Sequence, residues 1–381
     1  METPVADTRP LTASPPVVMA PREDGFEVVW AVRERALGQV EIVPADAPGA
    51  EPLLIGEDRY GFVPQGAEVL RVRVEGLEPG RLHLLRTRTR AAVDGRCETS
   101  PWREVRTLDP AADTARFVQW NDTHQHPDTL ALLDERSPRA DVLFWNGDVC
   151  NNWTDPAQLV PTILSPAGRD ITAGRPLAFS WGNHDVRGPF AHRLPEVVAT
   201  PQDQPYYALR IGPLAVIVLS TGEDKPDSHP SFEGRAAFAA SRARQARWLS
   251  RQIREPGFAD APYRLVVCHM PLRWLVEEEL GEEDYATGRW DEFSRASREL
   301  WHEHLVAWGA QVVLSGHTHV PALVDPAPGF PYAQVTGGGN TPEEATCIEG
   351  DAGPGQLRIA VRDLEGTVLH ELRLAPLTGA P

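Results

Sequence analysis

Five short motifs in this sequence carry residue types that bind metal ions or move protons. They combine histidine, aspartate and asparagine, and they read Asp122-Thr-His124, Gly147-Asp148, Gly182-Asn-His-Asp185, His269 and Gly316-His-Thr-His319. Imidazole, carboxylate and carboxamide oxygen together suit manganese, iron, cobalt or zinc, whereas a thiolate-rich site would favour zinc or an iron–sulfur cluster. Each motif alone occurs by chance in many chains, and a lone buried histidine is more often a hydrogen-bonded core residue. Their joint occurrence in one chain indicates a metal centre.

Each motif lies where a predicted apolar strand ends. The strand candidates are residues 116–121, 141–146, 176–181, 214–220, 263–268 and 310–315. Amphipathic helices are expected at 127–136, 236–254 and 291–308. This alternation predicts an α/β layered domain. Because ligands in open α/β sheets gather outside the carboxyl ends of strands, motifs spread over about 200 positions can meet at one place.

The N-terminal part of the chain has a different pattern. Residues 1–22 are rich in Pro, Ala and Thr and predict a flexible leader. Short β runs in 23–110, separated by Pro, Gly and Asp turns, predict a small antiparallel sandwich. Residues 74–84 resemble the turn before a late strand of fibronectin type III modules, although His83 stands where those modules usually carry tyrosine. The remainder, 111–381, contains the α/β domain and ends in a predicted β-hairpin.

Composition excludes several classes of function. Acidic residues outnumber basic ones by 54 to 37, a net charge of −17, which argues against nucleic acid or an anionic membrane as a partner. The four cysteines lie far apart without a CxxC pair, so neither a disulfide framework nor a zinc knuckle is indicated. No signal peptide or membrane-spanning run is recognisable. We expect a soluble, cytoplasmic protein, with secretion as the alternative if a leader precedes this sequence.

The order of the five motifs resembles the calcineurin-like metallophosphoesterase family over roughly residues 115–375. The resemblance implies a layered sandwich of two mixed β-sheets flanked by helices. It also implies two divalent or trivalent transition-metal ions, manganese or iron, with zinc or cobalt as alternatives. A metal-bridging hydroxide would attack a phosphomonoester or phosphodiester. The implied ligands of one metal are Asp122, His124, Asp148 and His319, and those of the second are Asn183, His269 and His317, with Asp148 as the bridge.

The resemblance assigns a catalytic role to His184, which would touch a phosphoryl oxygen or protonate the leaving group. Such a histidine needs a partner that fixes its tautomer. In relatives the partner often lies three residues after the Gly-Asp aspartate, where this chain has Asn151, so Asp185 is a second candidate. The fibronectin-like region is similar to that of purple acid phosphatases, but those carry a metal-bound tyrosine just after this aspartate. None follows Asp148, so a tyrosinate–iron site is not expected.

A different class of function also fits the fold: a non-catalytic scaffold that binds protein or carbohydrate. The complete ligand set favours the enzyme, acting on a small phosphorylated substrate. Hydrolysis of monoesters, diesters or pyrophosphate bonds remains open at this point. His126, His192 and Arg187 are candidates for a substrate pocket, although His126 could simply begin a helix and Arg187 could pair with surface carboxylates. The polar stretches 224–230 and 277–292 could rim the site or form a solvated surface.

Overall fold

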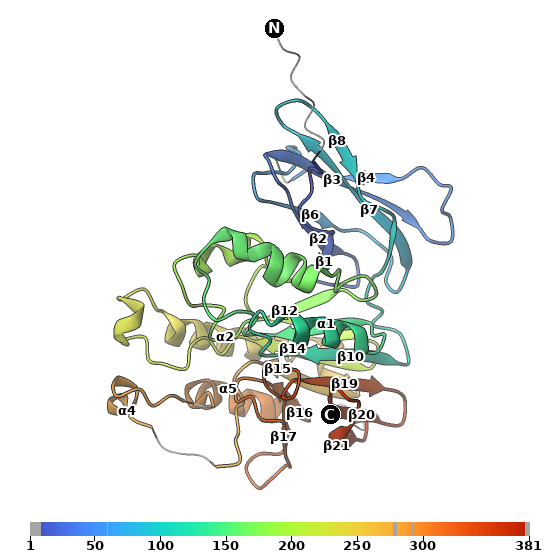
Figure 1. The fold of residues 1–381 in the computed structure, drawn as a ribbon. Coiled ribbons are helices and arrows are strands. Elements are labelled where there is room, and N and C mark those ends of the chain that lie inside the picture. The colour runs from blue at the N-terminus through green and yellow to red at the C-terminus, as the bar shows by residue number, and fades with distance from the viewer. Residues whose placement is uncertain (1–8, 59, 277–279, 292, 378–381) are drawn as a thin grey trace.

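Figure 1 shows a strand-rich N-terminal region stacked on a larger domain in which helices and sheets alternate. The computed structural model describes residues 9–58, 60–276, 280–291 and 293–377. Residues 1–8 of the expected leader and the acidic run 277–279 lie outside the described residues. No helix in the described ranges combines the length and the apolar character needed to cross a membrane.

The first sheet has nine strands in the order β21-β20-β19-β10-β11-β12-β1-β2-β6. Its strands are β1 (Val17–Met19), β2 (Phe26–Ala31), β6 (Val69–Val74), β10 (Ala115–Trp120), β11 (Val142–Asn146), β12 (Leu177–Ser180), β19 (Thr346–Ala352), β20 (Leu357–Asp363) and β21 (Val368–Leu374). The neighbours β10, β11 and β12 run parallel. Their side chains are buried almost throughout, as expected of strands covered on both faces. The predicted C-terminal hairpin is β20–β21 at one edge.

The second sheet has six strands in the order β13-β14-β15-β16-β18-β17. These are β13 (Tyr207–Ile211), β14 (Leu214–Leu219), β15 (Tyr263–Cys268), β16 (Val312–Ser315), β17 (Ala322–Val324) and β18 (Ala333–Thr336). The four central strands are parallel and the two outer strands antiparallel. The two sheets pack face to face through a core that includes Phe117 and Phe144 of the first and Val267 and Leu314 of the second. The implied pair of mixed sheets is therefore present.

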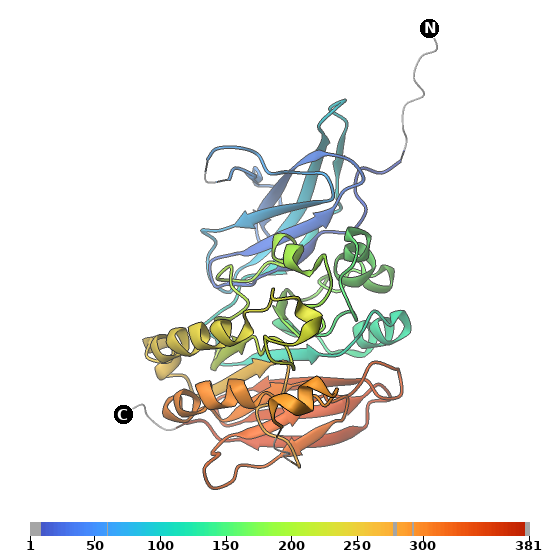
Figure 2. The same cartoon turned by 90° about the vertical axis from the view of Figure 1, so that its left-hand side faces the viewer.

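Helices cover the outer face of each sheet. They are α1 (Pro127–Arg136), α2 (Phe238–Gln252), α3 (Pro256–Ala259), α4 (Glu282–Ala286) and α5 (Arg295–Trp308), and single 3-10 or π turns lie at Pro156–Gln158, Val160–Leu164, Pro166–Gly168, Ala191–Glu196 and Pro230–Phe232. Leu130 and Leu133 of α1 pack on the first sheet. Leu249 of α2 and Trp301 of α5 pack on the second, where the two helices lie side by side (Figure 2). The three predicted helices correspond to α1, α2 and α5, although α5 begins four residues later than expected.

The N-terminal region is a two-layered β structure. A third sheet, in the order β4-β3-β7-β8 with β5 and β9 attached, packs against β2 and β6. Its strands are β3 (Ala36–Pro44), β4 (Leu53–Ile55), β5 (Gln65–Gly66), β7 (Leu82–Ala91), β8 (Cys97–Thr99) and β9 (Arg103–Arg106). Trp30 of β2, Leu70 of β6 and Leu85 of β7 meet in the core between the layers. The expected antiparallel strands thus form in this part of the chain.

Strand β1 corrects one expectation. It falls inside the segment predicted as a flexible leader, yet it is buried and pairs with two strands. Met19 pairs in parallel with Leu177 of β12, and Val17 pairs antiparallel with Val29 of β2. The leader prediction is wrong for these residues because three consecutive apolar side chains can complete a sheet even between proline-rich flanks. Through β1 the N-terminal region and the larger domain share one continuous sheet.

Candidate metal centre

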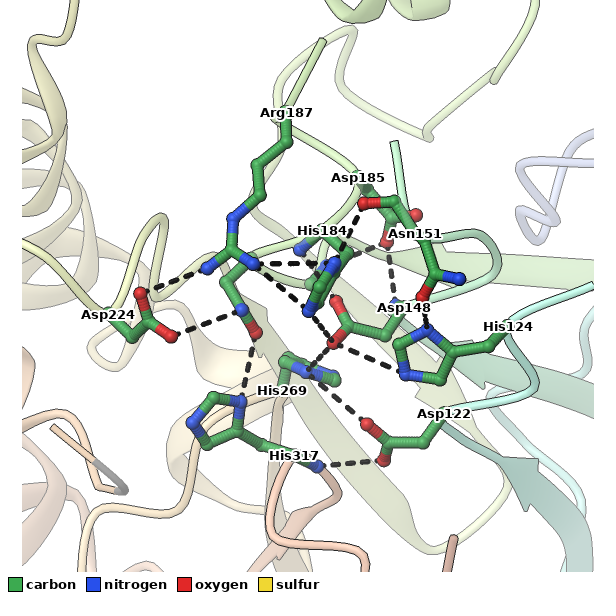
Figure 3. A network of polar contacts seen from close by, with 12 residues as sticks. Asp122, His124, Asp148, Asn151, His184, Asp185, Arg187, Asp224, His269 and His317 are labelled. Carbon is green, nitrogen blue, oxygen red and sulfur yellow. Dashed lines mark hydrogen bonds and ion pairs between the residues drawn. The ribbon is translucent and has the colours of Figure 1, made fainter. Parts of the chain in front are cut away.

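The polar motifs meet at the carboxyl ends of five parallel strands, three in the first sheet and two in the second (Figure 3). The loops after these strands carry Asp122 and His124 (β10), Asp148 (β11), Asn183 (β12), His269 (β15), and His317 and His319 (β16). Hydrogen bonds tie the loops together. The backbone N–H of His124 donates to the carbonyl oxygen of Asp148 at 3.0 Å. Across the sheets, the N–H of His317 donates to Oδ2 of Asp122 at 2.7 Å.

The backbone of this centre is strained. Ten non-glycine residues in the described ranges have a positive φ, and five of them are predicted ligands: Asp122, His124, Asp148, His317 and His319. Left-handed backbone costs about 1–3 kcal/mol at each such residue, so the surrounding structure must hold it in place. Strain of this kind gathers at functional sites, where it sets the direction of a side chain. The loop ends therefore aim their side chains at the expense of local stability.

Glycines make room for the two central carboxylates. A Cβ atom on Gly182 would lie 2.2 Å from Oδ1 of Asp148, and one on Gly316 would lie 2.3 Å from Oδ2 of Asp122. Gly147 has φ +77°, and its Cβ would lie 2.5 Å from the nitrogen of Gly182. No side chain fits at these positions, which explains the glycine beside three of the motifs.

Six of the seven predicted ligands form two compact groups. In each group one ligand atom per residue lies within 4.8 Å of the others: Asp122, His124 and His319 in the first, and Asp148, His269 and His317 in the second. Asp148 faces both groups, because its Oδ2 lies 3.2 Å from Nε2 of His269 and 3.8 Å from Nε2 of His124. The seventh residue, Asn183, joins the second group with its Oδ1 2.9 Å from Nδ1 of His317.

Several inward-facing atoms lack a hydrogen-bond partner among the described residues. Oδ1 of Asp122, Nε2 of His124 and Nε2 of His269 are all buried in this condition. Buried polar atoms are normally satisfied, and three such atoms without a hydrogen-bond partner at one place are suited to bind a cation. Carboxylate oxygen and imidazole nitrogen are suitable ligands for transition metals. The residues present therefore fit the implied metal ions.

In two of the histidines, a hydrogen bond at Nδ1 determines that Nε2 is the nitrogen left for a metal. Nδ1 of His124 donates to Oδ1 of Asn151 at 2.7 Å, and Nδ1 of His269 donates to the carbonyl oxygen of Asn146 at 2.8 Å. In the neutral ring, each bond places the proton on Nδ1 and leaves the lone pair on Nε2, the atom that lacks a hydrogen-bond partner. Such outer bonds are usual for metal-binding histidines.

The charges of the centre are strongly coupled. Burial alone would lower the pKa of His269, but the carboxylates of Asp148 and Asp122 outweigh it and raise the pKa to about 10. Burial opposes ionisation of Asp148, yet the neighbouring His269 holds the pKa of this carboxyl below its usual range. Burial lowers the pKa of His317 to about 4, with His269 adding to the shift. Because a metal ligand must be deprotonated, a metal that binds His269 would have to displace its proton.

Comparison with known proteins agrees with this geometry. The family model for calcineurin-like phosphoesterases matches residues 115–321, more than half of the chain. The chain belongs to the calcineurin-like phosphoesterase family. Among curated proteins no sequence matches this chain.

Two solved structures illustrate the relationship. The purple acid phosphatase PPD1 from yellow lupin (Lupinus luteus) seeds superposes with a TM-score of 0.67 at 13% identity, covering 96% of this chain and 75% of that chain. At this identity the likeness establishes a shared fold. A dimetal phosphatase from Danio rerio gives a TM-score of 0.45 at 12% identity, covering 68% of this chain and 98% of that chain. That score is too low to extend the comparison.

His184 lies at the rim of the candidate metal centre, with its Nε2 3.9 Å from Oδ2 of Asp148. Its Nδ1 donates to the backbone oxygen of Asn151 at 2.7 Å, and its Nε2 accepts from Arg187 at 3.0 Å. Position 151 therefore contacts His184 through its backbone, while its side chain binds His124. Burial, with a smaller contribution from Arg187, lowers the pKa of His184, so the imidazole is neutral at pH 7.

Asp185 does not contact His184 in the way the sequence suggested. Its buried carboxylate accepts backbone N–H bonds from Asp148 and Gly182 at 2.9 Å each and from Val149 at 3.2 Å. The expectation that Asp185 fixes the His184 tautomer is wrong, because the carboxylate accepts from the backbone of the loops after β11 and β12 and holds these two loops together. Burial and the neighbouring Asp148 raise the pKa of Asp185 to about 7.

Arg187 and the stretch 224–230 were candidates for the rim of the site, but the sequence did not predict that their charges join Glu223 in a buried group beside Asn183. The charge cluster consists of Arg187, Glu223, Asp224 and Lys225. Asp224 accepts from Nδ2 of Asn183 at 3.4 Å, which turns the amide oxygen toward His317. The signal was present, because this charged run follows β14 just as the ligands follow their own strands.

Three further candidates take separate places. His126 is exposed and precedes the first residue of α1, which agrees with the view that it begins a helix. His192 and Arg187 line a cavity beside the metal centre. Arg187 does pair with carboxylates, but these are the buried Glu223 and Asp224 and not the surface carboxylates considered from the sequence.

Proposed function

We propose that this chain hydrolyses phosphomonoesters or phosphodiesters with two bound transition-metal ions. The observation that carries the proposal is the pair of ligand groups facing across Asp148, with orphaned ligand atoms pointing inward. The proposed ligands are Asp122, His124, Asp148 and His319 for one ion, and Asp148, Asn183, His269 and His317 for the other. Two ions held by these residues would lower the pKa of bound water and offset the negative charge of a phosphoryl group.

The chain's own residues supply position and charge. His184 presents an unprotonated Nε2 at the rim, where Arg187 now donates to it. In the proposed complex a phosphoryl oxygen takes this Arg187 donor, which frees Nε2 of His184 to take up the proton that the attacking water releases. The protonated ring then donates to a phosphoryl oxygen or passes the proton to the leaving oxygen. Asn151 keeps the ring of His184 in orientation through its backbone oxygen.

The donor set supports manganese or iron, with zinc or cobalt as alternatives. Val149 follows Asp148, so the tyrosine that would give a purple iron site is missing from this position. We also propose that the N-terminal region is a fibronectin type III-like element that supports the phosphoesterase domain. A small phosphorylated molecule is the proposed substrate, and the net charge of −17 supports neither nucleic acid nor an anionic membrane as a partner.

The test is hydrolysis of p-nitrophenyl phosphate and bis-p-nitrophenyl phosphate by chelated protein and by protein reloaded with manganese, iron, cobalt or zinc. Metal content is measured in every sample. Turnover that chelation abolishes and metal restores supports the proposal, and the preferred ester separates a monoesterase from a diesterase. An Asp148→Ala variant purified in parallel excludes a contaminating phosphatase, with the exposed Asp113→Ala as its matched control. Two bound metals without turnover on any phosphate ester would favour the non-catalytic scaffold.

A further inference from the structure

A cavity of about 770 Å³ lies beside the metal centre. Most of its wall is apolar, and it contains four aromatic side chains: Trp181, Phe232, Phe238 and Trp290. Cavities of this size and composition bind organic molecules, with a few polar groups to orient them. A phosphoryl group needs only the metal centre and its rim, so this space is available to another part of a ligand.

The cavity and the metal centre share a wall. Arg187 lines the cavity and also donates to Nε2 of His184 at 3.0 Å. Lys225 lines it as well, and its Nζ lies 2.7 Å from Oδ1 of Asp224, the carboxylate that accepts from Asn183. A molecule whose phosphoryl group lies at the metal centre therefore has the cavity as its nearest recess for an organic group.

The cations in the cavity wall are already paired. Arg187 pairs with Glu223 and with Asp224 at 3.0 Å, and Lys225 pairs with the same two carboxylates at 3.1 and 2.7 Å. Nζ of Lys225 also lies 3.5 Å from the ring centroid of Trp290. Because these charges are balanced within the wall, the cavity offers no net attraction to a second anionic group.

Two further cations in the cavity wall are paired in the same way. Arg71 of β6 lines it and pairs with Glu27 and with Asp203 at 2.8 Å, and Arg235 pairs with Glu233 at 3.2 Å. Arg71 belongs to the N-terminal region, so that region contributes directly to the wall. Both parts of the chain therefore line the cavity.

We propose that this cavity binds the organic group of the phosphate ester, and that this group is bulky, uncharged and mostly apolar, such as a fused or linked pair of aromatic rings. The inference rests on the proposed function, since it assigns the substrate class of the same site. Burying one additional ring in the cavity favours the larger ester by about tenfold to a hundredfold in affinity or in kcat/KM.

Calorimetry with phosphonates, which resist hydrolysis, tests the inference without turnover. We expect metal-loaded protein to bind biphenyl-4-ylphosphonate about tenfold or more tightly than methylphosphonate. Equal affinity for the two would overturn the inference. Kinetics with phenyl phosphate and biphenyl-4-yl phosphate, whose phenols have similar acidity, should show the same preference in kcat/KM. Equal kcat/KM values for the two esters would overturn the inference and leave the proposed function intact, whereas selective phosphonate binding without any turnover would do the reverse.

Two neighbouring alanines provide a matched pair of variants. Ala236 lines the cavity and is half-buried, whereas Ala237 is exposed and lies outside the lining. Ala236→Trp should fill the cavity and reduce the ratio of affinities for biphenyl-4-ylphosphonate and methylphosphonate to near one. Ala237→Trp should leave this ratio unchanged. Should Ala236→Trp fail to fold, Ser231→Trp, at an exposed position of the same lining, replaces it. An unchanged preference in a folded, metal-loaded cavity variant would refute the assignment.

Discussion

Replacing Gly182 by alanine adds one carbon atom at the most crowded point of the metal centre. The new Cβ would lie 2.2 Å from Oδ1 of Asp148 and 2.4 Å from its backbone nitrogen. The substitution acts through contact alone, because Gly182 is not among the glycines with positive φ. Rotation of the Asp148 side chain cannot relieve the clash, since a backbone atom is also too close.

The expected magnitude follows from the distance. Real Cβ contacts stay beyond 3.0 Å, so the carboxylate must withdraw by about 0.8 Å, the difference between 3.0 and 2.2 Å. Metal–ligand distances tolerate only about 0.2 Å. A misplacement near 1 Å at a reacting centre costs on the order of a hundredfold in rate. We therefore expect that Gly182→Ala binds fewer than two metals per chain and that its kcat/KM is lower by at least about a hundredfold.

The assay measures metal content after reloading and turnover of the better p-nitrophenyl ester. Gly174→Ala is the matched control, because its Cβ would meet nothing within 4 Å and its φ is not positive. Thermal melting of the metal-free proteins separates a local effect from unfolding, since overpacking by one methyl group costs about 1–3 kcal/mol. A Gly182→Ala protein with two metals and turnover equal to Gly174→Ala would refute the assignment of Asp148 as the shared ligand.

Four further predictions concern residues around the same loops. Asp148→Ala should bind neither metal stably, and two ions per chain in metal analysis would contradict the bridge. His184→Ala should retain both metals but lose turnover, most with poor leaving groups, and a uniform loss across a leaving-group series would argue against proton donation. Asp185→Ala leaves three backbone N–H groups without acceptors, at a cost of about 1–3 kcal/mol each. Urea unfolding should show that the free energy of unfolding falls by about 3 kcal/mol or more in Asp185→Ala, and by less in Asp185→Asn. Because burial raises the pKa of the other three thiols, only Cys97, which is exposed, should react with a thiol reagent in native protein at pH 8, and a second fast-reacting thiol would contradict this burial.

The sequence located the loops of the candidate metal centre because parallel buried strands leave a simple signal. Continuous apolar runs at β10, β11 and β15 end directly before polar residues, and the carboxyl ends of such strands share one edge. Membership of the family and the layered α/β architecture were therefore predictable. Domain boundaries and individual ligand roles stay predictions.

What the sequence could not provide was the direction of side chains and the burial of polar loops. Asp185 is next to His184 in the chain, but its carboxylate accepts from the backbone of two other loops. Asp224 and Lys225 have the composition of a solvated turn, and they are buried only because Arg187, distant in sequence, pairs with the same cluster. Contacts between residues far apart in sequence decide these features, and single-sequence patterns do not contain them.

The continuous sheet formed through β1 has a consequence for any attempt to divide this protein. Deleting the N-terminal region would remove the strand that pairs with β12. β12, whose side chains are buried in the intact protein, would then become an edge strand with unpaired backbone groups, which promotes aggregation. The ion pair between Arg103 and Asp170 at 2.8 Å would be lost with the N-terminal region. The two regions should therefore denature in one cooperative transition, and neither is a module that can be transplanted alone.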